Sequence, residues 1–206
     1  MPDEWQKSFE GEFESDRGRD AVISAIRDHT AGGSSNPLLR VYGDAGVGVS
    51  RTVFEAIGID GIRERTLVST DGGKAIAEVV AHDPAASVVL VVDPATERDV
   101  DDLQPFVGAA SGRLIVVALL NPDPAAAPPP GHLLVRPLER AAVRRLLDPA
   151  NKGAKADEAL ATLAGGYPGL ALQIRSVVQR QGPGAELVAV ARGRLTSLLH
   201  RATIAV

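Results

Sequence analysis

Runs of consecutive apolar residues constrain the fold of this 206-residue chain more than any other feature. The runs are "LLRVY" at 38–42, "TLVST" at 66–70, "SVVLVVD" at 87–93 and "RLIVVALL" at 113–120. A strand with one face in solvent alternates apolar and polar residues, whereas a strand covered on both faces is apolar throughout. The runs therefore predict a parallel sheet with helices on both of its faces. "HLLVRP" at 132–137 is a candidate fifth strand.

The segments between these strands have the periodicity of helices, at 51–57, at 74–82 and at roughly 96–111. A further helix is predicted across "SDRGRDAVISAIRDHT", with Asp16 or Asp20 at its N-terminal end. Strands and helices that alternate in this way are typical of the α/β class.

After residue 135 the pattern is helical only. Four helical stretches follow one another with short breaks: "ERAAVRRLLD", "ADEALATLAGG", "PGLALQIRSVVQRQ" and "AELVAVARGRLTSLLHRA". We therefore expect an N-terminal tail at 1–15, an α/β core at 16–135 and a small helical lid domain at 136–206. Residues 1–135 carry 11 basic and 21 acidic side chains, whereas the lid carries 11 basic and 5 acidic ones. Most of the lid's arginines are expected to face acidic neighbours or solvent, and the alternative is that they face phosphate.

The composition excludes several kinds of site. The chain has no cysteine, which rules out disulfides, thiol catalysis and cysteine-ligated zinc. The four histidines lack the spacing of metal ligands, and aromatic residues, at 3% of the chain, are too few for platforms that stack single-stranded nucleic acid. The N-terminus is acidic and polar, unlike a secretory signal, and the apolar runs are too short to span a bilayer. We expect a cytoplasmic protein without membrane or nucleic-acid partners.

The stretch "GDAGVGVS" joins the first predicted strand to the helix that follows it. Two of its glycines and its serine match the phosphate-binding loop G-x-x-x-x-G-K-[ST], in which successive backbone N–H groups surround phosphate oxygens. Val49 occupies the position of the lysine and supplies neither its charge nor its donor. Arg51 lies two residues along the helix, where its side chain turns to the far side. The candidate nucleotide-binding residues of this stretch are Gly43, Asp44, Ala45, Gly46, Val47, Gly48, Val49, Ser50 and Arg51.

Asp93 ends the apolar run "VVLVVD". A carboxylate at the carboxyl end of a strand near a phosphate loop can hold Mg²⁺ through water, and Ser50 is the second candidate ligand. Asp93 is also the one candidate catalytic residue. Pro94 stands where many ATPases have an acidic residue that polarises water, and Glu97 is the next acidic residue along the chain. Without the lysine and that acid, we expect weak or no ATP hydrolysis.

In their order along the chain, these motifs resemble those of the signal-transduction ATPases with numerous domains (STAND), relatives of the AAA+ ATPases among the P-loop NTPases. The resemblance rests on "FESDRGRDAVISAIR", "GDAGVGVSR", "VVLVVD", "RLIVVALL", "VRPLERAAVRRLL" and "GGYPGLAL", and it spans roughly residues 13–182. It implies a nucleotide-dependent switch, with ATP or ADP and Mg²⁺ between the core and the lid and with Pro168 near the nucleotide. It also implies effector or sensor partners and leaves room for homo-oligomers.

Three hypotheses remain open. The first is a degenerate nucleotide-binding switch module of a larger regulatory or signalling protein. The second is a pseudo-ATPase that binds no nucleotide and serves as a scaffold or oligomerisation module. The third is an active ATPase that takes its lysine from elsewhere, such as Lys74 in "DGGKAI".

Overall fold

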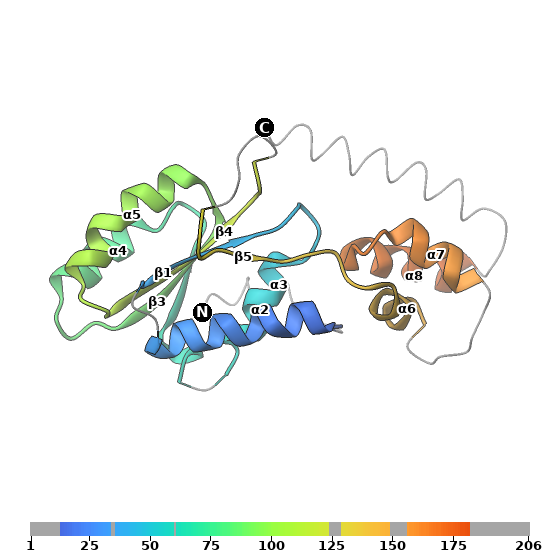
Figure 1. The fold of residues 1–206 in the computed structure, drawn as a ribbon, viewed down its shortest axis with the longest axis horizontal. Helices are drawn as coiled ribbons and strands as arrows, with labels where there is room; N and C mark the ends of the chain where they lie inside the picture. Colours follow the sequence, from blue (N-terminus) through green and yellow to red (C-terminus); the bar gives the residue numbers. More distant parts are fainter. Residues whose placement is uncertain (1–12, 34–35, 60, 124–128, 149–155, 182–206) are drawn as a thin grey trace. The chain divides into compact units, whose positions relative to one another are not determined.

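The structure is a computed structural model that describes residues 13–33, 36–59, 61–123, 129–148 and 156–181 (Figure 1). The chain forms two compact units. The first comprises Arg17–Asp44 and Gly48–Arg136. The second comprises Ala45–Val47, the described residues from Pro137 onward and residues 13–16.

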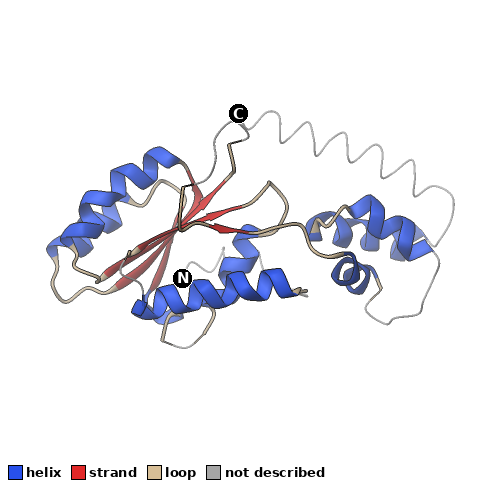
Figure 2. Ribbon diagram, in the orientation of Figure 1, coloured by secondary structure: helices blue, strands red, loops and turns tan. Residues whose placement is uncertain are grey.

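A five-stranded parallel sheet forms the centre of the first unit (Figure 2). Its strands are β1 (Leu38–Tyr42), β2 (Thr66–Ser69), β3 (Val88–Ala95), β4 (Leu114–Leu120) and β5 (Leu133–Leu134). They lie in the order β2-β3-β4-β1-β5, so β4 separates β1 from β3. The predicted α/β class with a parallel sheet is confirmed, and the fifth strand is limited to two residues.

Helices cover both faces of this sheet, as the apolar runs predicted. The helices α2 (Arg17–Asp28) and α3 (Val49–Ile57) lie on one face, and α4 (Lys74–His82) and α5 (Glu97–Ala109) lie on the other (Figure 1). Every residue of β4 is buried. The core beneath α4 and α5 is built largely from Val, Leu and Ala side chains, in agreement with the low aromatic content.

The helix α3 begins two residues earlier than predicted. The sequence placed its start at residue 51, but the helix begins at Val49 because Gly48 adopts a left-handed conformation (φ +93°) that ends the preceding turn. The N–H and hydroxyl groups of Thr52 both donate to the Gly48 carbonyl, at 3.0 and 2.8 Å. Val49 and Ser50 therefore lie in the first turn of α3.

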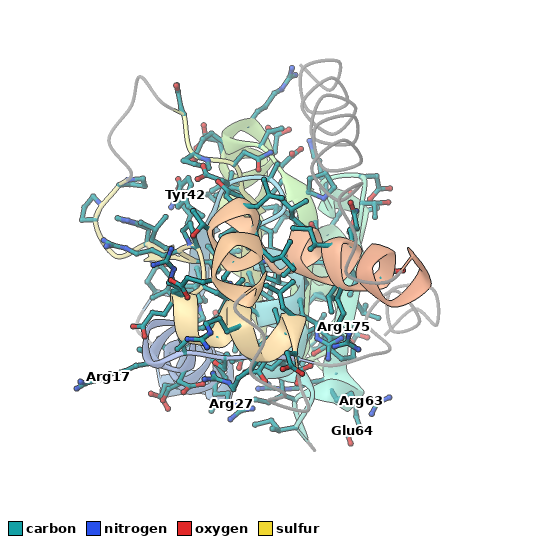
Figure 3. The ribbon with its side chains drawn as sticks, turned by 90° about the vertical axis from the view of Figure 1, so that its right-hand side faces the viewer. Arg17, Arg27, Tyr42, Arg63, Glu64 and Arg175 are labelled. Atoms are coloured by element: carbon teal, nitrogen blue, oxygen red, sulfur yellow. The ribbon has the colours of Figure 1, made fainter. Side chains whose placement is uncertain are left out.

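Arginines from distant elements bind the carboxyl ends of two helices in the first unit. Arg27 of α2, which is labelled in Figure 3, donates to the Glu55 and Ala56 carbonyls near the end of α3, at 3.0 and 3.2 Å. Arg113 donates to the Val80 carbonyl near the end of α4, at 2.8 Å. The last carbonyls of a helix lack intrahelical partners and carry partial negative charge, so a guanidinium group stabilises them.

The second unit contains the described helices α6 (Arg140–Leu147), α7 (Ala156–Ala164) and α8 (Pro168–Gln181). Their apolar faces meet in a core that includes Val143, Leu146 and Ile174. Arg175 donates to the Leu146 carbonyl at 3.0 Å. These three helices were predicted, while the stretch from residue 185 and the first twelve residues of the predicted tail lie outside the described residues. None of the described helices is long and apolar enough to cross a membrane.

The segment before α2 is attached to α6 within the second unit. Glu14 forms an ion pair with Arg145 at 2.7 Å, and Arg145 also donates to the Ser15 carbonyl at 3.0 Å. The Asp16 carboxylate accepts a hydrogen bond from the Glu139 N–H, directly before α6, at 2.8 Å. Asp16 therefore stabilises the start of a helix 123 residues further along the chain, a role that the sequence did not indicate.

Candidate functional site

The glycine-rich loop leads from the carboxyl end of β1 to α3. Gly43 is buried, and its N–H donates to the Leu120 carbonyl at 3.2 Å, so the loop leaves the sheet beside the end of β4. Gly46 and Gly48 adopt left-handed conformations (φ +83° and +93°) that residues with a Cβ rarely adopt. Between them, the Val47 side chain is fully buried (0% exposed). This path of strand, turn and helix is the one that the phosphate-loop motif requires.

The N-terminus of α3 differs from that of α5, on the other face of the sheet. Gly48 provides no side-chain cap for α3, and Gly73 provides none for α4. By contrast, α5 begins with a capping box formed by Thr96 and Asp99. The first N–H groups of a helix lack intrahelical partners and carry partial positive charge. An anion therefore fits at the start of α3 better than at the start of α5.

The side chains at the start of α3 supply no cation to the loop. Val49 and Ser50 are half-buried. Arg51 is directed along α3: its Nη2 lies 2.6 Å from Glu55 Oε1, and its guanidinium lies over the Phe54 ring, 5.7 Å from the ring centroid. In this arrangement the Arg51 guanidinium binds Glu55 and points away from the loop, so only the backbone N–H of Arg51 is available to a ligand in the loop.

Lys74 lies far from the loop. It is the exposed first residue of α4, which follows the edge strand β2. Two strands, β3 and β4, lie between β2 and β1. Three strand spacings of about 4.8 Å separate the lines of β2 and β1 by about 14 Å. Lys74 is therefore poorly placed to replace a lysine in the loop.

Asp93 lies at an irregularity of β3. Val92 pairs with Ala118, and the next pair joins Ala95 to Leu120, so β3 has one extra residue at this point. Val92 belongs to the core beneath α4 and α5. Asp93, the next residue, is half-buried near the carboxyl end of the strand. Val92 and Ala95 both belong to that core, so the regular alternation of side chains is broken here and does not assign Asp93 to the face of α3.

Tyr42, the last residue of β1, contacts a carboxylate that the sequence did not connect with it. The Tyr42 hydroxyl donates to Glu97 Oε1, and Arg40 Nε lies 3.3 Å from Glu97 Oε2. The ring packs edge-on against His132, with 5.6 Å between centroids. Burial, followed by the hydrogen bond to Glu97, raises the pKa of Tyr42 to about 12. Glu97 is thus held against β1 on the face of α5 and does not replace the acid that is missing at Pro94.

The "GGYPG" stretch forms the turn between α7 and α8. Gly166 has φ +89°, and its carbonyl accepts a hydrogen bond from the Leu138 N–H at 2.8 Å. A Cβ at Gly166 would lie 2.5 Å from Pro137 Cβ. Pro168 is the first residue of α8, where its missing N–H costs the helix nothing. The predicted site residue Pro168 is therefore the first residue of α8, and the turn before it is held against Pro137 and Leu138 through Gly166.

Tyr167 is a neighbour of the loop that the sequence did not indicate. A Cβ built on Gly46 would lie 3.7 Å from Tyr167 Cδ1, so the aromatic ring lies beside Gly46 of the glycine-rich loop. The second unit thus brings the "GYP" motif and the loop tip together. The sequence did not indicate this neighbour for two reasons. The order of the two motifs along the chain gives no distance between them, and a tyrosine before a helix is as typical of a packing residue as of a residue in a binding site.

No protein-family model matches the chain, and no curated protein matches it significantly. Solved structures are similar to it. C. elegans PCH-2 aligns with a TM-score of 0.61 at 11% identity, over 93% of this chain and 72% of that one. Rhizobiales Trip13 aligns with a TM-score of 0.56 at 16% identity, over 93% and 94%. A chain of the E. coli MS115-1 HORMA:CdnC:Trip13 complex aligns with a TM-score of 0.52 at 16% identity, over 86% and 87%. The fold therefore resembles that of AAA+ ATPase domains.

Proposed function

We propose that the chain is a nucleotide-binding module that acts as a STAND-type switch within a larger regulatory or signalling protein and hydrolyses ATP weakly or not at all. One observation carries the proposal: Gly43–Ser50 combines two left-handed glycines with a helix N-terminus that no side chain caps. Backbone N–H groups in such a turn, together with the positive end of a helix, bind phosphate without a lysine, although less tightly.

In this proposal the phosphates of ADP or ATP lie on the loop, and Ser50 and Asp93 hold Mg²⁺. The metal ion would neutralise phosphate charge when bound. The loop residues position the phosphates through their backbone. Hydrolysis is expected to be slow, because Val49 supplies no charge, Pro94 replaces an acid, and Glu97 binds Tyr42 and Arg40.

Calorimetry with ADP, ATP and adenosine tests the binding. We expect ADP and ATP to bind and adenosine to bind more weakly, since the loop recognises phosphate. In Gly48→Val, a side chain at φ +93° strains the turn, and ADP and ATP affinity should fall. Gly108→Ala in α5 is the matched control, because a Cβ there meets no atom within 4 Å.

The absence of heat with both nucleotides on a folded protein would favour the alternative, a nucleotide-free scaffold or oligomerisation module. The valine in place of the lysine supports that alternative. Phosphate release tests hydrolysis separately, and steady ATP turnover that disappears in Asp93→Ala would contradict the expectation of slow hydrolysis.

A further inference from the structure

The Tyr167 ring lies between two glycines of the second unit. A Cβ on Gly46 would be 3.7 Å from Cδ1, and a Cβ on Gly165 would be 3.7 Å from Cδ2 on the other edge of the ring. These are ordinary van der Waals distances for a Cβ. A side chain at either glycine would therefore touch the ring, so the ring lies beside both glycines.

The backbone of Tyr167 is fixed on both sides. Its N–H donates to the Ala164 carbonyl at the end of α7 at 2.9 Å, and its carbonyl accepts from the Ala171 N–H in α8 at 3.0 Å. The preceding Gly166 is enclosed by Pro137 and Leu138. The ring is therefore presented to the loop from a rigid turn.

The buried side chain of Val47 anchors one end of the loop tip, whereas the residues before it are exposed. Asp44, Ala45 and Gly46 are exposed, and a glycine samples more backbone conformations than any other residue. Without a lysine at position 49, phosphate affinity depends on backbone donors that already point in the right direction. Ordering those donors before binding lowers the entropy cost of binding.

We propose that Tyr167 is a positioning residue that packs against Gly46 and holds the loop tip in its phosphate-binding conformation. Among the described residues, the Tyr167 hydroxyl has no hydrogen-bond partner, so the ring carries this effect. The inference rests on the proposed function for its ligand, but the packing contact can be tested without one.

The test compares Tyr167→Ala, Tyr167→Phe and the control Leu172→Ala, which shortens an exposed apolar side chain of α8. Tyr167→Ala removes the ring beside Gly46 and should weaken ADP binding about three- to tenfold in calorimetry, within the range usual for residues in contact. Tyr167→Phe and Leu172→Ala should remain within about twofold of the wild type. Amide hydrogen exchange at residues 44–48, measured without nucleotide, should be faster in Tyr167→Ala than in the other proteins.

The two readouts separate this inference from the proposed function. If the folded wild type binds no ADP, the proposed function fails, and the exchange measurement still decides whether Tyr167 holds the loop. Unchanged exchange and unchanged affinity in Tyr167→Ala would overturn the inference, as would a Tyr167→Phe protein that behaves like the alanine variant. If Tyr167→Ala does not fold, Tyr167→Leu takes its place with the same expected results.

Discussion

Gly166→Ala tests the packing that fixes the "GYP" turn in the second unit. Gly166 has φ +89°, which an L-residue with a side chain adopts only with strain. Its added Cβ would lie 2.5 Å from Pro137 Cβ and 2.9 Å from the Leu138 carbonyl oxygen. Both distances are shorter than real Cβ contacts, and one of the two neighbours is backbone, so the turn must move.

The size of the effect follows from these two terms. A left-handed residue with a Cβ costs roughly 1–2 kcal/mol, and overpacking costs roughly 1–3 kcal/mol. The smaller conformational entropy of alanine in the unfolded chain offsets about 0.4–1 kcal/mol. We therefore expect Gly166→Ala to lower the free energy of unfolding by about 2–4 kcal/mol, a large part of the roughly 5–15 kcal/mol that is usual for a protein.

Urea unfolding followed by far-ultraviolet circular dichroism measures this loss. The matched control is Gly169→Ala in the first turn of α8, where an added Cβ meets no atom within 4 Å. Alanine is a better helix former than glycine, so the control should be stabilised by up to about 1 kcal/mol. A Gly166→Ala protein as stable as Gly169→Ala would refute the packing argument.

Three further changes test the loop and two buried side chains. Val49→Lys should tighten ATP binding roughly tenfold to a hundredfold in calorimetry, because a hydrogen bond to a charged group contributes about 1.5–3 kcal/mol. The gain in affinity should shrink as the salt concentration rises. A folded Val49→Lys protein with no gain in affinity would mean that the loop has lost more than a lysine. The pKa of Tyr42 is raised to about 12, so the unfolded state loses this proton first as the pH rises. The free energy of unfolding should therefore fall by about 2 kcal/mol more in the wild type than in Tyr42→Phe between pH 10 and 12, and equal losses in urea titrations would contradict this. Burial lowers the pKa of His29, so the unfolded state binds a proton on this residue first as the pH falls below about 6.5. The free energy of unfolding should therefore fall less in His29→Gln than in the wild type between pH 7 and 5. An equal fall in both proteins would show that His29 does not cause the loss of stability.

The strands and most helices could be predicted from the sequence, because the pattern of apolar residues within each segment determines which element it forms. An apolar run such as residues 113–120 has to be covered on both faces, and β4 is buried along its whole length. The start of α3 was placed too late, because periodicity detects the apolar face of a helix and not its first turn. That first turn depends on the backbone conformation of Gly48.

Contacts between distant residues could not be read from the sequence. Asp16 binds the Glu139 N–H, and Glu97 binds Tyr42, although nothing in the residues between them indicates either pair. Glu97 shows the consequence for the site. Its sequence position allowed a role beside Asp93, whereas its contacts hold it on another part of the sheet.

The glycines of the loop do not by themselves distinguish a phosphate site from an ordinary turn. Gly46 and Gly48 have positive φ angles, so a turn of this shape needs glycine whether or not it binds a ligand. A side-chain cap stabilises a helix by roughly 1 kcal/mol, and α5 has one while α3 and α4 do not. A phosphate at α3 would supply the missing acceptor. Because α4 also starts without a cap, the full spacing from Gly43 to Ser50 is what distinguishes α3 as the candidate phosphate site.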